Sequence, residues 1–291
     1  MRITEGRIVK ILGDIYYVSN GFEVLECSCL KTIRRDRLVI GDIVTIKENE
    51  YAKDKYIITK ILPRKNVIPR PYVANLDKLL IILAIEPKPD LLLVDKLVIY
   101  CRLNNIEPII VINKIDLASA SFAESIHSQY LGIKIFEISA KNEIGLNKIK
   151  SELSGAFSAA CGQSAVGKSS FINALMPNLQ LQTQGLSEKI SRGKHTTRVN
   201  EIFVCDDFLI ADTPGFSSLD LNIDYKDLCK YYPEFEDYID NCKYLDCSHI
   251  KEGKDCGVCR AISDGKINKD RYDRYIDLYQ KLKEKWEKKY D

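Results

Sequence analysis

Hydrophobic and polar residues alternate along the first part of the chain in five short runs, a pattern typical of β-strands. The runs cover residues 6–11, 15–18, 22–27, 39–46 and 56–61, and Gly13-Asp14 between the first two predicts a hairpin turn. Five short strands in one small domain predict a closed barrel of the OB type, a scaffold that often binds oligonucleotides; an SH3-like barrel is the alternative. A linker rich in proline follows, and we expect the barrel domain to cover residues 1–68.

From about residue 73 the pattern changes to apolar runs that alternate with stretches of helical spacing. The expected strands are residues 78–84, 108–112, 133–138, 157–161, 201–204 and 208–211, and the expected helices are residues 91–104, 145–153 and 169–175. Strands separated by helices predict a mostly parallel sheet, with ligand-binding loops at the carboxyl ends of the strands. We expect this α/β domain to cover residues 73–221.

The last part of the chain, residues 222–291, is polar and rich in Tyr and Cys, and it ends in a helix that starts near Lys269. Apolar residues recur along this helix at helical spacing and form one stripe: Tyr272, Tyr275, Ile276, Tyr279, Leu282 and Trp286. Three of them are tyrosines, whose hydroxyl groups suit a half-buried surface. The stripe predicts a docking face within a helical C-terminal module.

Composition changes this picture little, since the 291 residues carry a net charge of only +2. No apolar run reaches the ~18–20 residues that cross a bilayer, and the N-terminal residues lack the apolar core of a signal peptide. We expect a cytoplasmic protein with no membrane partner, and a monomer. Two basic groups fit either a solvated face or an RNA surface: Arg34, Arg35 and Arg37, and Lys281, Lys283, Lys285, Lys288 and Lys289.

A glycine-rich loop carries the clearest chemistry. Gly162-Gln163-Ser164-Ala165-Val166-Gly167-Lys168-Ser169 matches the phosphate-binding P-loop and stands between a predicted strand and a predicted helix. Backbone N–H groups of such a loop, together with the helix N-terminus, bind phosphate oxygens. Lys168 is expected to reach the β- and γ-phosphates, and Ser169 to bind Mg²⁺. These residues and Ser170 form the predicted phosphate site.

Two motifs that follow predicted strands indicate that the nucleotide is GTP. Asn113-Lys114-Ile115-Asp116 offers a carboxylate that accepts hydrogen bonds from N1 and N2 of guanine, a donor pair that adenine lacks. Ser139-Ala140-Lys141 is expected to supply a backbone N–H to guanine O6. Pairing of otherwise buried polar groups discriminates between ligands by ~10⁴-fold or more.

A fourth motif, Asp212-Thr213-Pro214-Gly215, follows the strand 208–211. An acid at this place in P-loop enzymes holds Mg²⁺, usually through water, and Gly215 is expected to bind the γ-phosphate. The order of the motifs is permuted, because the guanine motifs precede the P-loop, whereas ordinary GTPases have them last. A pocket built from loops at one end of a sheet needs only that the loops converge, and domain termini often lie close together, so this order is compatible with a working site.

The segment 187–198 lies between the P-loop and Asp212 and is expected to act as a switch. We expect Thr197, with Thr196 as the alternative, to bind Mg²⁺ only when the γ-phosphate is present. Phe216 stands where Ras-like GTPases carry the Gln that orients the attacking water, and a phenyl ring cannot do this. His195 is therefore our candidate for positioning that water, and an ordinary surface loop residue is the alternative interpretation.

Four of the ten cysteines crowd into residues 242–259 beside His249. Cys242, Cys247, His249 and Cys256 offer three thiolates and an imidazole, the ligands of a closed, structural zinc site. Cys259 is the alternative to Cys256, since the two form a Cys-x-x-Cys. The remaining six lie mostly in apolar stretches and are expected to be small buried core residues: Cys27, Cys29, Cys101, Cys161, Cys205 and Cys229.

The barrel, the permuted order of nucleotide motifs and the Cys/His module occur together in one known family. Over essentially its whole length the chain resembles the bacterial circularly permuted ribosome-assembly GTPases of the RsgA (YjeQ/YloQ) type, and Gly193-Lys194-His195-Thr196-Thr197 is similar to the switch pattern of that family. The resemblance implies a GTPase that the small ribosomal subunit stimulates during its late maturation, with the barrel and the zinc module on 16S rRNA and a catalytic His195. The chain departs from the family pattern at Ala165, where Gly is usual, and in the interval from His249 to Cys256, which is one residue longer.

Two functions therefore compete. The first is a GTP-hydrolysing assembly factor whose turnover rises on small ribosomal subunits. The second is an RNA-binding module that uses GTP mainly as a static or slow conformational ligand, with no such rise. The resemblance favours the first.

Overall fold

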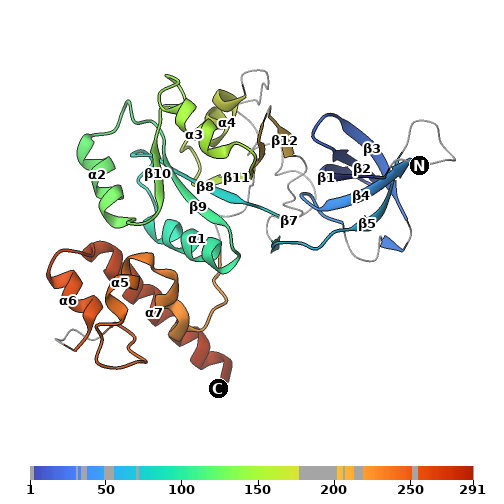
Figure 1. Cartoon of the computed structure of the whole chain (residues 1–291). Helices are drawn as coiled ribbons and strands as arrows, with labels where there is room; N and C mark the ends of the chain where they lie inside the picture. The colour runs from blue at the N-terminus through green and yellow to red at the C-terminus, as the bar shows by residue number, and fades with distance from the viewer. Residues whose placement is uncertain are drawn as a thin grey trace.

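The computed structural model describes residues 3–30, 32–33, 38–48, 56–69, 72–176, 202–205, 207–212, 219–250 and 255–290. Figure 1 shows three parts: a barrel on one side, a central layered domain, and a helical module that packs under the central domain. Among the helices of these described stretches, none is long and apolar enough to cross a membrane.

The N-terminal barrel consists of the strands β1 (Ile3–Leu12), β2 (Ile15–Ser19), β3 (Val24–Cys29), β4 (Ile43–Glu48) and β5 (Tyr56–Ile61). The strands close in the order β1-β2-β3-β5-β4, with β3 and β5 parallel and the other neighbours antiparallel. Its core is formed by alternate residues of the strands, including the fully buried Ile8, Val18 and Ile58. The prediction of an OB-like barrel is confirmed, and the parallel closure argues against the SH3-like alternative.

The central domain contains a six-stranded sheet in the order β10-β9-β8-β11-β13-β12. Its strands are β8 (Lys78–Leu83), β9 (Glu107–Ile112), β10 (Lys134–Glu137), β11 (Phe157–Gly162), β12 (Ile202–Val204) and β13 (Leu209–Asp212). Neighbours are parallel except for β12, which pairs antiparallel with β13 at the edge. The predicted mostly parallel sheet is thus confirmed.

Helices cover both faces of this sheet, since the apolar strands have no polar face to expose to water. One face packs against α1 (Leu91–Leu103) and α2 (Ala120–Gln129), and the other packs against α3 (Leu146–Leu153) and α4 (Lys168–Leu175). Successive residues of β8 alternate between the two cores: Leu79 and Ile81 face α1, and Leu80 and Ile82 face α4. The helix α2 was not predicted from the sequence.

A polar junction fixes the barrel to the central domain, next to the small hairpin of β6 (Val67–Pro69) and β7 (Tyr72–Ala74). Arg7 of the barrel donates through Nη1 to the carbonyl oxygens of Gly41 and Asn75, both at 3.2 Å, and its guanidinium lies 5.0 Å from the ring centre of Phe157. Gly41 has a φ of +89°, and a Cβ there would lie 2.1 Å from the carbonyl oxygen of Ala74. The backbones therefore meet too closely for any other residue at this position.

The C-terminal module is helical, as predicted, and consists of η3 (Tyr225–Tyr231), η4 (Pro233–Phe235), α5 (Glu236–Ile239), α6 (Gly257–Ser263) and α7 (Lys269–Tyr290). The expected stripe of α7 lies in the module core, where Tyr272, Tyr275 and Leu282 are buried. Two corrections are needed: Leu278, which was not expected in the stripe, is also buried in this core, and Trp286 is 38% exposed. The cysteine prediction needs a similar correction: Cys205, which follows β12, and Cys229, within η3, are only half-buried.

Candidate nucleotide-binding site and metal centre

The predicted nucleotide motifs lie at one edge of the sheet. β9, β10, β11 and β13 are parallel, so the loops that follow their carboxyl ends all emerge on the same side. Asp212 ends β13 and pairs in register with Ala160 of β11, two residues before Gly162 begins the P-loop. The permuted order of the motifs therefore has no effect on where they meet.

Asn113 holds three loops of this edge together. Its Nδ2 donates to the carbonyl oxygen of Val166 at 2.9 Å, and its Oδ1 accepts from the backbone N–H of Ala140 at 3.1 Å. Its own backbone N–H donates to Leu83 at 2.8 Å, and the residue is 2% exposed. The side chain predicted to bind nucleotide is thus engaged with the loops themselves, and it fixes the P-loop relative to the guanine motifs.

Lys114 makes a second link between the same loops. Its Nζ donates to the carbonyl oxygens of Ala165, at 2.8 Å, and Glu86, at 3.0 Å. Its backbone φ of +59° is in the left-handed region, which turns the chain sharply after the strand. Asp116 follows this turn with an exposed side chain, so its carboxylate is accessible to a ligand.

The P-loop backbone explains the positions of its glycines. Gly162 has a φ of +148°, and a Cβ there would lie 2.2 Å from the carbonyl oxygen of Ile82. Gly167 has a φ of +91°, and a Cβ there would lie 2.4 Å from Nδ2 of Asn113. Ala165 also has a positive φ, +65°, which costs an L-residue other than Gly some free energy. A Gly at this position would relieve that strain.

Positive charge lies at the mouth of the loop. Lys168 is the first residue of α4, and its Nζ donates to the carbonyl oxygen of Gly162 at 2.9 Å, across the loop that would surround a phosphate. Ser169 and Ser170 follow in the first turn of the helix, where backbone N–H groups have no acceptor within the helix. An ammonium group, free N–H groups and hydroxyls together suit a bound phosphate.

The loop after β10 is a tight turn that begins at Ser139. The backbone of Ser139 pairs with that of Ile144, and its Oγ accepts from the N–H of Asn142 at 3.2 Å. Gly145 closes the turn with a φ of +76°, and a Cβ there would lie 2.4 Å from the carbonyl oxygen of Glu137. Because the N–H of Ala140 already donates to Asn113, that group is occupied when the loops are assembled.

Gln163 has a contact that the sequence did not suggest. Its Oε1 accepts a 2.9 Å hydrogen bond from the backbone N–H of Asp90. Asp90 is the N-cap of α1, and its Oδ1 accepts from the N–H of Leu93 at 3.0 Å. The second residue of the P-loop is therefore tied to the first turn of α1.

Several predicted residues lie outside the described part of the chain. They are the switch residues His195, Thr196 and Thr197, then Gly215 and Phe216 after Asp212, and the basic residues Arg34, Arg35 and Arg37. Their roles stay predictions.

The C-terminal module gathers the four predicted metal ligands. One ligand atom from each of Cys242, Cys247, His249 and Cys256 lies within 4.8 Å of the other three. His249 Nδ1 is 3.5 Å from the sulfurs of Cys242 and Cys256, and these sulfurs are 3.9 Å apart. A tetrahedral Zn²⁺ with ~2.3 Å bonds to sulfur and ~2.0 Å bonds to nitrogen spaces its ligand atoms by about 3.5–3.8 Å. The cluster thus has the right ligands for zinc, and the atoms of Cys242, His249 and Cys256 have close to the spacing that zinc requires.

Cys259 takes a different position from Cys256. Its Sγ lies 3.7 Å from the carbonyl oxygen of His249 and 3.5 Å from the Tyr272 hydroxyl, which itself donates to the same carbonyl at 2.7 Å. The structure therefore brings Cys256 into the cluster and uses Cys259 to hold the backbone of His249, whose φ is +56°. Sequence spacing alone left these two alternatives open.

Backbone N–H groups support the sulfurs. The N–H of Gly257 donates to Cys242 Sγ at 3.3 Å, and the N–H of Cys259 donates to Cys256 Sγ at 3.4 Å, at the start of α6. Burial raises the pKa of Cys247 and of Cys256 to about 11, so both thiols resist ionisation unless a cation compensates the charge. A bound divalent metal supplies that compensation.

Known proteins similar to this chain agree with the site. The model of the RsgA GTPase family matches residues 61–222. The small ribosomal subunit biogenesis GTPase RsgA of Caldanaerobacter subterraneus subsp. tengcongensis is 38% identical over 100% of this chain and 99% of its own, and that of Clostridium kluyveri is 38% identical over 98% and 99%.

Two solved structures have the same fold. YjeQ from Thermotoga maritima is 29% identical, with a TM-score of 0.82 over 97% of this chain and 99% of its own. YloQ, described as a circularly permuted GTPase, is 27% identical, with a TM-score of 0.79 over 98% of this chain and 96% of its own. The fold is thus shared over nearly the whole length of the chain, and the chain belongs to the RsgA GTPase family.

Proposed function

We propose that this protein hydrolyses GTP and acts in the maturation of the small ribosomal subunit, with its three parts at residues 1–68, 73–221 and 222–291. The observation that carries the GTPase proposal is the pair of hydrogen bonds by which Asn113 joins the P-loop at Val166 to the guanine motif at Ala140. That connection assembles a phosphate site and a base-reading site as one unit. Family membership supports hydrolysis as the reaction.

In this proposal the guanine is read by Asp116 and by the turn after β10. The exposed carboxylate of Asp116 accepts from N1 and N2 of the base. Ser139 N donates to Ile144 and Ala140 N donates to Asn113, so Lys141 is the residue of this motif whose N–H is left for guanine O6. This assignment refines the expectation drawn from the tripeptide alone.

The phosphates are bound by the backbone N–H groups of residues 162–170, and the Lys168 ammonium moves from Gly162 to the β- and γ-phosphates. Mg²⁺ would be held by Ser169 and Thr197, with Asp212 acting through water, and it would neutralise charge on the phosphates. Hydroxyl and carboxylate oxygens at one sheet edge fit this metal. His195 holds the water that attacks the γ-phosphorus, and the bond to the β-phosphate oxygen breaks.

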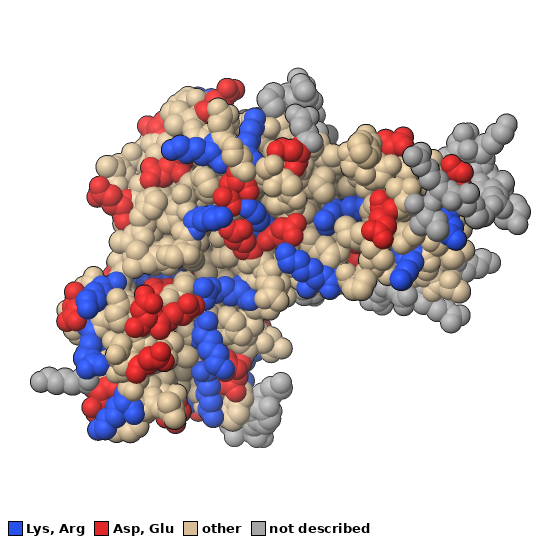
Figure 2. Space-filling model, viewed as in Figure 1, with Lys and Arg blue, Asp and Glu red and all other residues tan. Residues whose placement is uncertain are grey.

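The maturation role rests on the names of the relatives, which are small ribosomal subunit biogenesis GTPases. We propose that the barrel and the zinc module contact 16S rRNA, and that the protein is a cytoplasmic monomer. One Zn²⁺ on Cys242, Cys247, His249 and Cys256 would have a structural role, because four protein ligands leave no open position for chemistry. Lys281, Lys283 and Lys288 are exposed on α7, but Figure 2 shows basic and acidic side chains interspersed on the visible face, so charge alone does not select the RNA surface.

Competition for a fluorescent GDP tests the nucleotide assignment. GTP should displace the probe at concentrations at least about a hundredfold lower than ATP does, because adenine leaves the Asp116 carboxylate without its donors. Asp116→Ala should weaken GTP binding and reduce this preference, while Asp240→Ala, the same change at an exposed site in the zinc module, should leave both unchanged. Equal displacement by ATP would refute the assignment.

A further inference from the structure

Helix α1 lies between the sheet and the C-terminal module (Figure 1). Its side chains contribute to the cores of both. Leu97 and Val98 pack with the sheet, whereas Ile99 packs into the module core with Tyr232 and Tyr275. A helix buried on two opposite faces cannot move relative to one neighbour without disturbing the other, because protein interiors are close-packed.

A buried group of charges joins α1 to α7. We name it the Asp95 junction: Asp95, Tyr130, Glu234, Arg271 and Arg274. Asp95 of α1 is fully buried and accepts from Arg271 Nη1 at 2.5 Å, from Arg274 Nε at 2.6 Å and from the Tyr130 hydroxyl at 2.7 Å. Two carboxylates face two guanidinium groups, so the charges balance.

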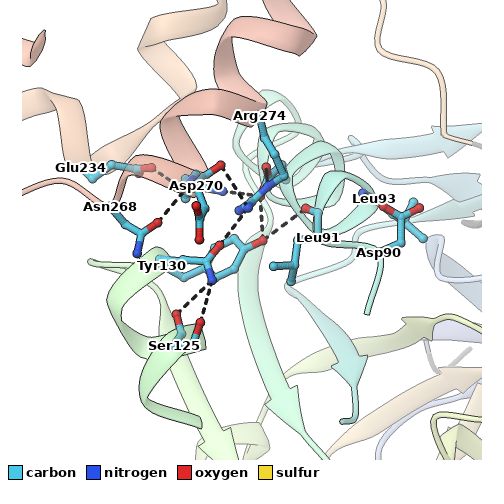
Figure 3. A network of polar contacts seen from close by, with 12 residues as sticks. Asp90, Leu91, Leu93, Ser125, Tyr130, Glu234, Asn268, Asp270 and Arg274 are labelled. Atoms are coloured by element: carbon cyan, nitrogen blue, oxygen red, sulfur yellow. Dashed lines mark hydrogen bonds and ion pairs between the residues drawn. The ribbon is translucent and has the colours of Figure 1, made fainter. Parts of the chain in front are cut away.

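Arg271 contacts both the central domain and the module. Its Nε donates to Glu234 of the module, and its guanidinium lies between the rings of Tyr130, of the central domain, and Tyr232, of the module, at 4.5 and 4.8 Å from their centres. Arg274 also donates to Gln129 at 2.8 Å, next to Tyr130 at the end of α2. Figure 3 shows Arg274 and Glu234 converging with Tyr130 from different elements.

The junction fixes one geometry between α1 and α7. Apolar surfaces tolerate sliding, whereas a desolvated charge that loses its partner carries a large cost, so buried ion pairs favour a single register. Within the junction, Arg271 Nη2 and Glu234 Oε2 are buried and have no hydrogen-bond partner in the described structure, so the group keeps two unused polar atoms.

The other end of α1 reaches the nucleotide site, because the P-loop residue Gln163 accepts from the N–H of the N-cap residue Asp90. Asp90 and Asp95 are five residues apart on one helix, so a shift of the first turn is transmitted to the junction along a rigid element. The path from phosphate loop to zinc module thus consists of Gln163, α1 and the Asp95 junction.

We propose that α1 couples the occupancy of the P-loop to the position of the zinc module, through Gln163 at one end and the Asp95 junction at the other. The proposal rests on the proposed nucleotide site and adds its regulation. By thermodynamic linkage, a partner bound to the zinc module changes the affinity of the P-loop for nucleotide. Bound nucleotide then changes the affinity of the module for that partner by the same factor. This route is separate from the predicted switch segment 187–198, since it uses no residue of that segment.

The test measures the dissociation constant of fluorescent GDP for four forms of the full-length protein: wild type, Gln163→Ala, Arg274→Gln and the double variant. Arg274 belongs to the module and is tied to α1, so its replacement should weaken GDP binding about fivefold or more. In the Gln163→Ala background the same replacement should have little further effect, because the path is already cut. Lys281→Gln, the same loss of charge at an exposed site of α7, should have no effect.

Hydrogen exchange of the amides of residues 270–282 provides the second measurement. Saturating GDP should slow exchange there in wild type and in Lys281→Gln, but not in Gln163→Ala. Arg274→Lys keeps the charge, so its affinity for GDP should lie between those of wild type and Arg274→Gln. This variant replaces Arg274→Gln in the test if Arg274→Gln does not fold. Normal GDP binding by Arg274→Gln and Arg274→Lys, or additive losses in the double variant, would overturn the proposal. Failure of wild type to bind GDP would instead refute the nucleotide site itself.

Discussion

Nδ2 of Asn113 donates a 2.9 Å hydrogen bond to the carbonyl oxygen of Val166, 53 residues further along the chain. The bond is buried and connects the loop predicted to read the base to the loop predicted to surround the phosphates. In a permuted chain these loops have exchanged their order, yet the contact needs only that β9 and β11 end at one edge of the sheet. The contact between loops therefore defines the site better than their order does.

Gly167 tests that contact, because a Cβ there would lie 2.4 Å from Asn113 Nδ2. Gly167→Ala should weaken binding of fluorescent GDP by about tenfold or more, since a buried amide left without its acceptor costs ~1–3 kcal/mol. Gly155→Ala is the matched control: its φ is also positive, +70°, but a Cβ there meets nothing within 4 Å. Equal losses in the two variants would mean that backbone strain, and not the Asn113 contact, is responsible.

Replacement of Ala165 by Gly is expected to stabilise the protein. Its φ of +65° costs a residue with a Cβ more than it costs Gly, so Ala165→Gly should raise the free energy of unfolding by about 0.5–1 kcal/mol in urea titrations. Ala118→Gly, in a turn without a positive φ, should lower it instead, because Gly makes the unfolded chain more flexible. A loss of stability in Ala165→Gly would contradict the strained conformation.

Zinc content distinguishes the cysteines of the metal cluster. Wild type and Cys259→Ala should each bind one Zn²⁺ per chain by atomic absorption, whereas Cys256→Ala should lose it, because only Cys256 lies among the four ligands. Removal of the metal by a chelator should also change the fluorescence of Trp286, the single tryptophan, whose ring lies 5.8 Å from that of Tyr225 in the same module. Full zinc content in Cys256→Ala would refute the ligand set.

Glu152 is expected to stabilise the fold by an amount that depends on pH. Hydrogen bonds from Lys134, at 2.7 Å, and from Lys78 lower the pKa of Glu152 below its ordinary value in unfolded chains, about 4.3. A carboxylate with a lowered folded pKa stabilises the protein fully above the unfolded pKa, and loses this effect as the pH falls through the folded one. Glu152→Gln should therefore cost about 1 kcal/mol at pH 7 and almost nothing near pH 2.

The control for this prediction is Glu124→Gln, at an exposed position of α2. Its effect on the free energy of unfolding should be small and should not vary between pH 7 and pH 2. A Glu152→Gln loss that is the same at both ends of the acid range would show that packing, and not charge, holds Glu152.

Elements with strong periodicity could be predicted from the sequence, and those without it could not. The strands of the central sheet are mostly apolar runs, so their bounds were predicted within one or two residues. The helix α2 has the sequence ASFAESIHSQ, with few apolar residues, and was missed for that reason. Spacing could not separate Cys256 from Cys259, because the choice depends on the backbone turn at His249.

The Asp95 junction was also beyond prediction. Asp95 and Arg271 are 176 residues apart, and each alone resembles an ordinary surface charge on an amphipathic helix. Only the packing of the module under α1 buries them together. The same holds for Gln163, whose partner Asp90 lies 73 residues earlier in the chain.

GTP turnover in the presence of purified small ribosomal subunits tests the central claim most directly. The account predicts slow hydrolysis by the protein alone, a rise of several-fold or more when subunits are added, and loss of that rise in His195→Ala with GTP binding retained. Turnover that is unchanged by the subunits in the wild-type protein would contradict the claim, and would favour an RNA-binding module that holds GTP as a static ligand.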